Sequence, residues 1–168
     1  MSLVLKLFLV VFVLGSSVAS AETYYRLKNR WTGDYMHIEH KRGSVEVSTK
    51  GPSGGWWSAQ WSIVPVTGQY FRLKNRWTGD YMHIEHKRGS VELTKTIIPG
   101  GMWSAQWEKV PVVGSYVRLK NRWTGDYMHI EHKRGFVELT KTIISGGMWS
   151  AQWELVPAGA SYPIGSIR

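Results

Sequence analysis

The chain has 168 residues, no cysteine and a formal net charge of +9 at neutral pH. Without cysteine it has no disulfide, no thiol nucleophile and no cysteine-ligated zinc, so a small disulfide-stapled scaffold is excluded. The positive charge favours anionic partners. Acidic residues are nevertheless interleaved with the basic ones, and no polybasic run of the kind that contacts phosphate backbones is present, so no nucleic acid partner is expected.

The segment 1–21 has the pattern of a secretory signal peptide. Lys6 precedes an apolar run from Leu7 to Leu14, and Ala19-Ser20-Ala21 has the small residues that signal peptidase requires. The apolar run is much shorter than the ~20 residues that span a bilayer, and no second such run follows it. We therefore expect cleavage after Ala21, no membrane span, and a secreted, extracellular mature protein.

The rest of the chain consists of three copies of one 46-residue stretch. The letters RLKNRWTGDYMHIE occur at 26–39, 72–85 and 118–131. A fixed period indicates a repeat architecture in which neighbouring copies complete one core. Three copies predict one closed three-fold domain, followed by a short tail that we expect to be poorly ordered. The domain is expected at 22–157, the repeats at 24–65, 70–111 and 116–157, and the tail at 158–168.

Each copy is predicted to contain four short strands, because apolar and polar residues alternate with period two between turn signals. In the first copy the strands are expected at 25–29, 35–40, 44–48 and 59–64. Turns are expected at 32–34 and 41–43, and a loop at 48–55. Met36, Ile38, Val45, Val47 and Trp61 are the expected core residues of these strands. No window has the apolar stripe of an amphipathic helix, so the class is all-β.

About twelve strands in three four-stranded units match a β-trefoil, in which six strands close a barrel and six form hairpins that cap it. Closure of the barrel removes exposed sheet edges. The main alternative is a propeller, but three blades are fewer than the usual range of about four to eight. A jacalin-like prism also has three sheets, yet such prisms rarely repeat so overtly.

The stretch from Gly33 to Ile38, followed by Gln60-Trp61, resembles the ricin-type β-trefoil lectins, and is similar to the ricin-B-like modules of secreted bacterial polysaccharide-degrading enzymes. In that family a Gly-x-x-Leu-Asp-Val stretch places an aspartate in a shallow sugar pocket, and a Gln-x-Trp motif anchors the last strand. This chain has His37 in place of the aspartate, and its glutamine is adjacent to the tryptophan. The resemblance implies a carbohydrate-binding fold without naming the sugar.

Recognition of a sugar needs an aromatic face for its C–H groups and planar polar groups for its hydroxyls. The outward face of the second strand supplies a tyrosine, a histidine and a glutamate, the neighbouring turn an asparagine and an aspartate, and a later loop a tryptophan as stacking platform. We expect the carboxylates to accept from hydroxyls, and the histidine and asparagine to donate. The alternative for the aspartate is a turn-capping role, and for the tyrosine a plain strand-surface role. The candidate carbohydrate-binding residues are Asn29, Asp34, Tyr35, His37, Glu39, Trp57, Asn75, Asp80, Tyr81, His83, Glu85, Trp103, Asn121, Asp126, Tyr127, His129, Glu131 and Trp149.

No metal, cofactor or catalysis is expected. His37 and Glu39 share one face of a strand, but His40 points the other way, so three ligands would not converge. No nucleophile lies beside a partnered base at a suggestive spacing. We therefore predict a secreted multivalent lectin whose partners are glycans. Two alternatives stay open: a salt-sensitive binder of sulfated polysaccharide that uses a repeated basic surface, and a secreted structural or adhesive protein.

Overall fold

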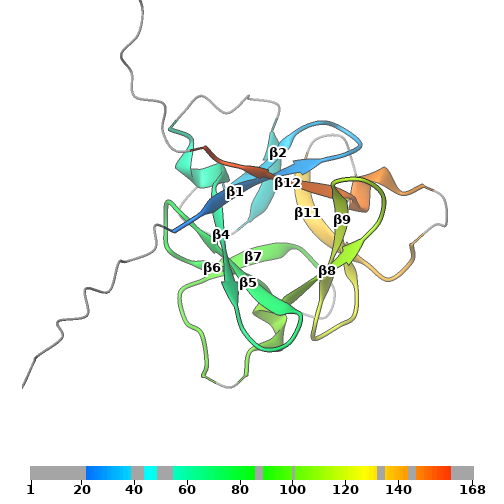
Figure 1. The fold of residues 1–168 in the computed structure, drawn as a ribbon. Helices are drawn as coiled ribbons and strands as arrows, with labels where there is room; N and C mark the ends of the chain where they lie inside the picture. Colours follow the sequence, from blue (N-terminus) through cyan, green and yellow to red (C-terminus); the bar gives the residue numbers. More distant parts are fainter. Residues whose placement is uncertain are drawn as a thin grey trace, which may run out of the picture.

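The computed structural model describes residues 22–38, 44–48, 55–85, 89–99, 101–131, 135–143 and 147–159. The predicted signal peptide at 1–21, the turn at 41–43 and the tail beyond 159 lie outside these residues. The described residues form twelve strands and three one-turn 3-10 helices arranged with three-fold pseudosymmetry (Figure 1). None of the described helices is long and apolar enough to cross a bilayer.

Every repeat has the same order of elements. The first contains β1 (Tyr24–Asn29), β2 (Tyr35–Ile38), β3 (Val45–Ser48), η1 (Trp57–Ala59) and β4 (Trp61–Pro65). The second contains β5 (Tyr70–Asn75), β6 (Tyr81–Ile84), β7 (Val91–Thr94), η2 (Trp103–Ala105) and β8 (Trp107–Pro111). The third contains β9 (Tyr116–Asn121), β10 (Tyr127–Ile130), β11 (Gly135–Thr140), η3 (Trp149–Ala151) and β12 (Trp153–Pro157).

The first and last strands of the three repeats close a six-stranded barrel. The antiparallel ring runs β1–β4–β5–β8–β9–β12 and returns to β1, where Leu27 pairs with Leu155. The third repeat therefore closes on the first, and none of the barrel strands has an open edge. The predicted fold class, an all-β β-trefoil, is confirmed.

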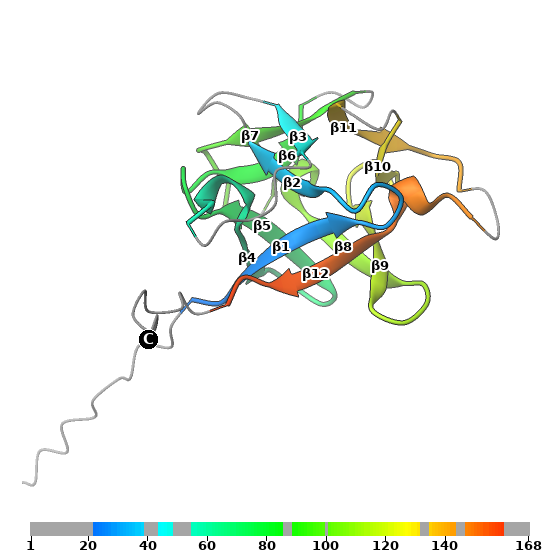
Figure 2. The same ribbon diagram turned by 90° about the horizontal axis from the view of Figure 1, so that it is seen from above.

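The remaining strands form three hairpins, β2–β3, β6–β7 and β10–β11, that cap one end of the barrel (Figure 2). Three bridges at equivalent positions join the hairpins to one another: Ser44 to Glu92, Ser90 to Glu138, and Phe136 to Glu46. The three hairpins of the cap thus form a closed triangle.

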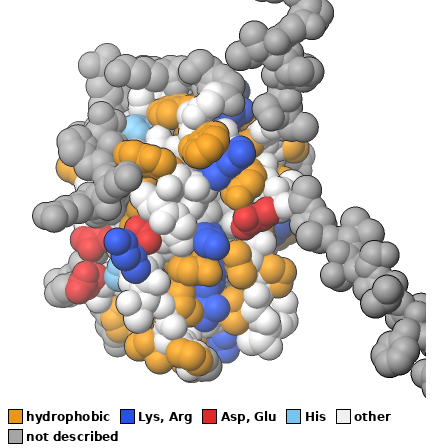
Figure 3. All heavy atoms as spheres, turned by 90° about the vertical axis from the view of Figure 1, so that its left-hand side faces the viewer, with side chains coloured by type: hydrophobic (Ala, Val, Ile, Leu, Met, Phe, Trp, Pro, Cys, Tyr) orange, Lys and Arg blue, Asp and Glu red, His pale blue; other side chains and the backbone are white. Residues whose placement is uncertain are grey.

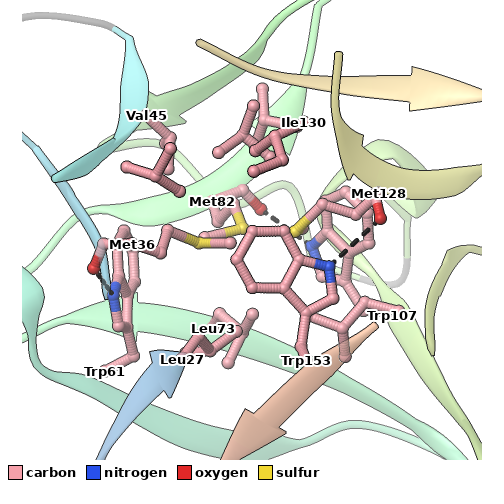
Figure 4. Close-up of a cluster of buried hydrophobic side chains, with 14 of the residues drawn as sticks. Leu27, Met36, Val45, Trp61, Leu73, Met82, Trp107, Met128, Ile130 and Trp153 are labelled. Atoms are coloured by element: carbon pink, nitrogen blue, oxygen red, sulfur yellow. Dashed lines mark hydrogen bonds between the residues drawn. The ribbon is translucent and has the colours of Figure 1, made fainter. Parts of the chain in front are cut away.

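Each repeat supplies the same residue types to one shared core (Figure 4). At most 1% of each side chain in five equivalent sets is exposed. The sets are Leu27, Leu73 and Leu119; Met36, Met82 and Met128; Ile38, Ile84 and Ile130; Val45, Val91 and Val137; and Trp61, Trp107 and Trp153. The Trp61 indole donates from Nε1 to the Met36 carbonyl at 3.3 Å, which ties the barrel to the hairpin of its own repeat. Burial of one such indole contributes roughly 4–6 kcal/mol of transfer free energy.

One local expectation is corrected. The last strand of the first repeat begins at Trp61 and not at residue 59, because the preceding residues form a 3-10 turn. The Gln60 N–H donates to the Trp57 carbonyl at 3.1 Å, and the Ala59 N–H donates to the Trp56 carbonyl at 3.2 Å. This turn includes Trp57 and directly precedes β4.

Candidate functional site

The asparagine that was expected to donate to a sugar has a structural role. Asn29 is fully buried, and its Oδ1 accepts the N–H groups of Trp31 at 3.0 Å and Thr32 at 3.4 Å. Its Nδ2 donates to the Ser150 carbonyl at 2.9 Å. Asn75 and Asn121 repeat this arrangement. A buried amide engaged in this way fixes a turn onto the preceding repeat and is not available to a ligand.

The aspartate of the same turn also lies outside the pockets. Asp34 is 5% exposed, its N–H donates to Thr32 Oγ1 at 3.1 Å, and its carbonyl accepts from the Asn29 N–H at 2.8 Å. Gly33 allows this tight turn because it has a φ of +77°, which side-chain-bearing residues rarely adopt. The equivalent Asp80 and Asp126 are buried as well. These hydrogen bonds are made by the backbone of the aspartate, and none of the three aspartates lines a pocket. That their carboxylates accept from sugar hydroxyls stays a prediction.

The expected stacking platforms are exposed and firmly held. Trp57 is 50% exposed, and the guanidinium of Arg76 from the next repeat lies 4.8 Å from its ring centroid. The same guanidinium lies 4.5 Å from the Tyr24 ring and donates from Nη1 to Gln60 Oε1 at 2.6 Å. The two equivalent stacks are Tyr70–Arg122–Trp103 and Tyr116–Arg30–Trp149. Each indole thus has a guanidinium group stacked on one face. A cation–π contact of this kind contributes about 0.5–2 kcal/mol of interaction free energy.

Three equivalent pockets lie at the junctions between successive repeats, and we call them site 1, site 2 and site 3. Site 1 has a volume of 420 Å³ and is lined by His37, Ser48, Trp56, Trp57 and Trp77, among others. Site 2 has a volume of 580 Å³, and its lining includes His83, Glu85, Met102, Trp103 and Trp123. Site 3 has a volume of 630 Å³, and its lining includes Trp31, His129, Glu131, Met148 and Trp149. Each site therefore combines a histidine and a tryptophan of one repeat with a tryptophan of the next.

The second tryptophan of each site comes from the next repeat, and it was not among the candidate residues predicted from the sequence. Trp31, Trp77 and Trp123 are 38–39% exposed on the turn after the first strand of each repeat. Trp31 lies in site 3, so the first repeat completes the last site. The sequence does contain a signal for these residues, because a tryptophan recurs there every 46 residues. It does not show that the tryptophan reaches the pocket of a neighbouring repeat, because that junction forms only when the barrel closes. Exposed apolar side chains lie beside Lys, Arg and His on the face that Figure 3 shows.

The histidines of β2, β6 and β10 each line one site, although His37 and His83 are buried and only His129 is partly exposed. Each faces a glutamate across its hairpin; His129, for example, pairs with Glu138. Burial lowers the pKa of His129 from the ordinary 6.5, and the nearby Glu138 and Glu131 oppose this effect. A neutral imidazole offers one donor and one acceptor, which suits a sugar hydroxyl.

The other predicted residues divide between the sites and their surroundings. Glu85 lines site 2 and Glu131 lines site 3, both as exposed carboxylates, whereas Glu39 lies outside the described residues. Tyr35, Tyr81 and Tyr127 begin the hairpins and do not line the sites. The Lys74 ammonium lies 5.9 Å from the Tyr81 ring centroid, so this tyrosine packs against the barrel side.

One group of described side chains has a metal-ligand composition. Ligand atoms of His83, Glu85 and Glu92 all lie within 4.8 Å of one another. The sequence considered only neighbours along one strand, whereas Glu92 reaches the group from across the hairpin. A nitrogen with two carboxylates suits a divalent ion such as Zn²⁺, although bond lengths near 2.1 Å would require the three side chains to move closer together.

A comparison with protein-family models and with curated proteins gives no match. Solved structures do match. The GlcNAcα1-4Gal-releasing endo-β-galactosidase from Clostridium perfringens is 34% identical with a TM-score of 0.69, over 80% of this chain. This chain spans only 32% of that enzyme. The designed three-fold symmetric protein ThreeFoil is 26% identical with a TM-score of 0.64, over 79% of this chain and 97% of its own.

A third match, SeviL bound to asialo-GM1 saccharide, is 15% identical with a TM-score of 0.64, over 80% of this chain and 96% of its own. The six-stranded barrel, the triangular cap and these matches together define a β-trefoil. Within that class the chain has the fold of the ricin-B-like lectins, as the resemblance predicted.

Proposed function

We propose that this protein is a secreted, multivalent lectin that binds glycans reversibly at sites 1, 2 and 3. The observation that carries the proposal is the threefold recurrence of a pocket with two indoles from adjacent repeats and a histidine of the capping hairpin. Exposed apolar side chains gathered in one place mark binding sites, and pockets of about 300–1,000 Å³ suit small ligands.

The chemistry of binding follows from the lining of site 2. The free face of Trp103 takes the apolar side of a sugar ring, because its other face is stacked on Arg122. The His83 imidazole exchanges hydrogen bonds with ring hydroxyls, and the Glu85 carboxylate accepts from a further hydroxyl. Trp123 provides the second wall. We propose reversible binding at these sites without catalysis.

Three weak sites on one rigid domain gain affinity for repetitive glycans through effective concentration. The part shared with the clostridial enzyme amounts to 32% of that protein, so we propose that the shared part is a binding module and that the enzyme's activity does not extend to this chain. Export through the segment 1–21 would bring the sites to extracellular or microbial surface glycans.

Three of the basic residues that a purely electrostatic binder would use are held in contacts within the fold. Arg30, Arg76 and Arg122 each stack on two aromatic rings and donate to a glutamine. Their guanidinium groups are thus engaged in the fold and are not presented as an open basic surface. The structure gives no specific support to the adhesive alternative.

The test is a glycan array probed with the mature domain at low salt and again at about 0.5 M NaCl, where screening is strong. A pocket lectin keeps its signal on neutral glycans, whereas binding only to sulfated glycans that is lost in salt would refute the proposal. Substitution of Trp57, Trp103 and Trp149 together by leucine should abolish the neutral signal. The matched control is Phe136→Ser, which removes an aromatic residue that is 52% exposed and restores the serine found at the equivalent Ser44 and Ser90.

A further inference from the structure

The lining of site 1 differs from that of the other two sites, and the largest change is at the residue directly before the 3-10 helix. This residue is Trp56 in the first repeat, Met102 in the second and Met148 in the third, and it lines the pocket in every case. A smaller change is Ser48, which is a threonine in the other two repeats. The backbone differs as well. Met102 and Met148 have φ of 54° and 45°, in the left-handed region, whereas Trp56 has a φ of −75°. The left-handed conformation costs about 1–2 kcal/mol in a residue with a side chain.

The hydrogen bonds of the loop explain how the two conformations are held. In the second repeat Gln106 Nε2 donates to the Gly101 carbonyl at 2.9 Å, and Gln152 does the same to Gly147 in the third repeat at 2.8 Å. In the first repeat the equivalent Gly55 carbonyl accepts instead from the Trp57 N–H at 2.8 Å. The backbone at residues 55–57 therefore differs from that of the other two repeats, and the Trp56 ring contacts the pocket histidine.

Trp56 occupies part of site 1. Its ring centroid lies 5.0 Å from that of His37, with the two planes at 38°. His37 is 3% exposed, compared with 8% for His83, and His129 is more exposed than either. The volume of site 1 is 420 Å³, against 580 and 630 Å³ for sites 2 and 3.

We propose, on the basis of the lectin function above, that the three sites have two specificities and that Trp56 determines the difference. Site 1 accepts a single terminal sugar residue, because Trp56 closes the space beside His37. Sites 2 and 3 also accept a second residue or a substituent there, because a methionine side chain is flexible and adapts to different shapes. The protein thus combines one selective site with two permissive sites, and its avidity for a glycan depends on how many sites its termini fit.

The test compares galactose with the disaccharide GlcNAcα1-4Gal, which the clostridial enzyme releases. Binding is followed site by site through the indole N–H signals of Trp57, Trp103 and Trp149, assigned with single Trp→Phe variants. In the wild type, galactose should bind the three sites with similar affinity, and the disaccharide should bind site 1 about tenfold more weakly than sites 2 and 3, as expected when one clash distinguishes two ligands.

The Trp56→Met variant should raise the affinity of site 1 for the disaccharide about tenfold and leave sites 2 and 3 unchanged, so the other two sites serve as internal controls. Met102→Trp should lower the affinity of site 2 for the disaccharide. If the left-handed backbone prevents Met102→Trp from folding, the result for Trp56→Met is sufficient to test the inference. Equal disaccharide affinities at all three wild-type sites, or no gain at site 1 in Trp56→Met, overturn this inference and leave the lectin function standing. Absence of binding of either sugar at every site also overturns this inference. If the glycan array is blank as well, the lectin function is overturned with it.

Discussion

Replacement of Asn75 by alanine separates a structural role from a sugar-binding role. Asn75 is 1% exposed and makes three hydrogen bonds: Nδ2 to the Ser58 carbonyl at 2.9 Å, and Oδ1 from the N–H groups of Trp77 at 2.9 Å and Thr78 at 3.3 Å. Alanine leaves one carbonyl and two N–H groups without these partners. At about 1 kcal/mol for each lost bond, we expect the free energy of unfolding to fall by about 3 kcal/mol.

A loss of that size lowers the melting temperature by roughly 10 °C in a domain of this length. The assay is urea unfolding followed by tryptophan fluorescence, with Asn121→Ala as the equivalent change in the next repeat. Glycan binding should change at site 1, because the turn that Asn75 holds carries Trp77, and should be retained at site 2. An unchanged urea midpoint with loss of binding at site 2, the site of the asparagine's own repeat, would refute the structural role and restore the asparagine as a sugar ligand.

Three further predictions concern the sites. Arg76→Leu removes the cation between Tyr24 and Trp57 and should cost about 1–3 kcal/mol in urea unfolding, with weaker binding at site 1; Arg76→Lys should recover little, because lysine lacks the planar guanidinium. Burial lowers the pKa of His129, so the unfolded chain binds the proton first and stability falls as the pH drops below 6.5; His129→Gln should reduce the slope between about pH 7.5 and 5.5 in urea titrations. Millimolar EDTA should leave glycan binding unchanged, and a loss confined to site 2 would instead indicate a metal at its histidine and glutamates.

The architecture could be predicted from the sequence because each repeat contains local patterns that indicate its strands and turns. Alternation of side chains in Tyr35 to Ile38 predicts Met36 and Ile38 in the core, and both are buried in the structure. The histidine between them is 3% exposed and lines site 1. Trp61 was recognisable as a core residue from its place in the last strand. Period, turn glycines and strand alternation are properties of neighbouring residues, so they can be read without tertiary contacts.

The composition of the sites was decided only by closure of the barrel. Asn29 and Asp34 are polar residues beside a turn, and no local pattern shows that one is bonded to Ser150 from the far end of the chain or that the other is buried. Trp31 belongs to the first repeat by sequence and to site 3 by structure. Contacts between repeats depend on how the ring of strands closes, and these long-range contacts, unlike the alternation along a strand, have no signature in the local sequence.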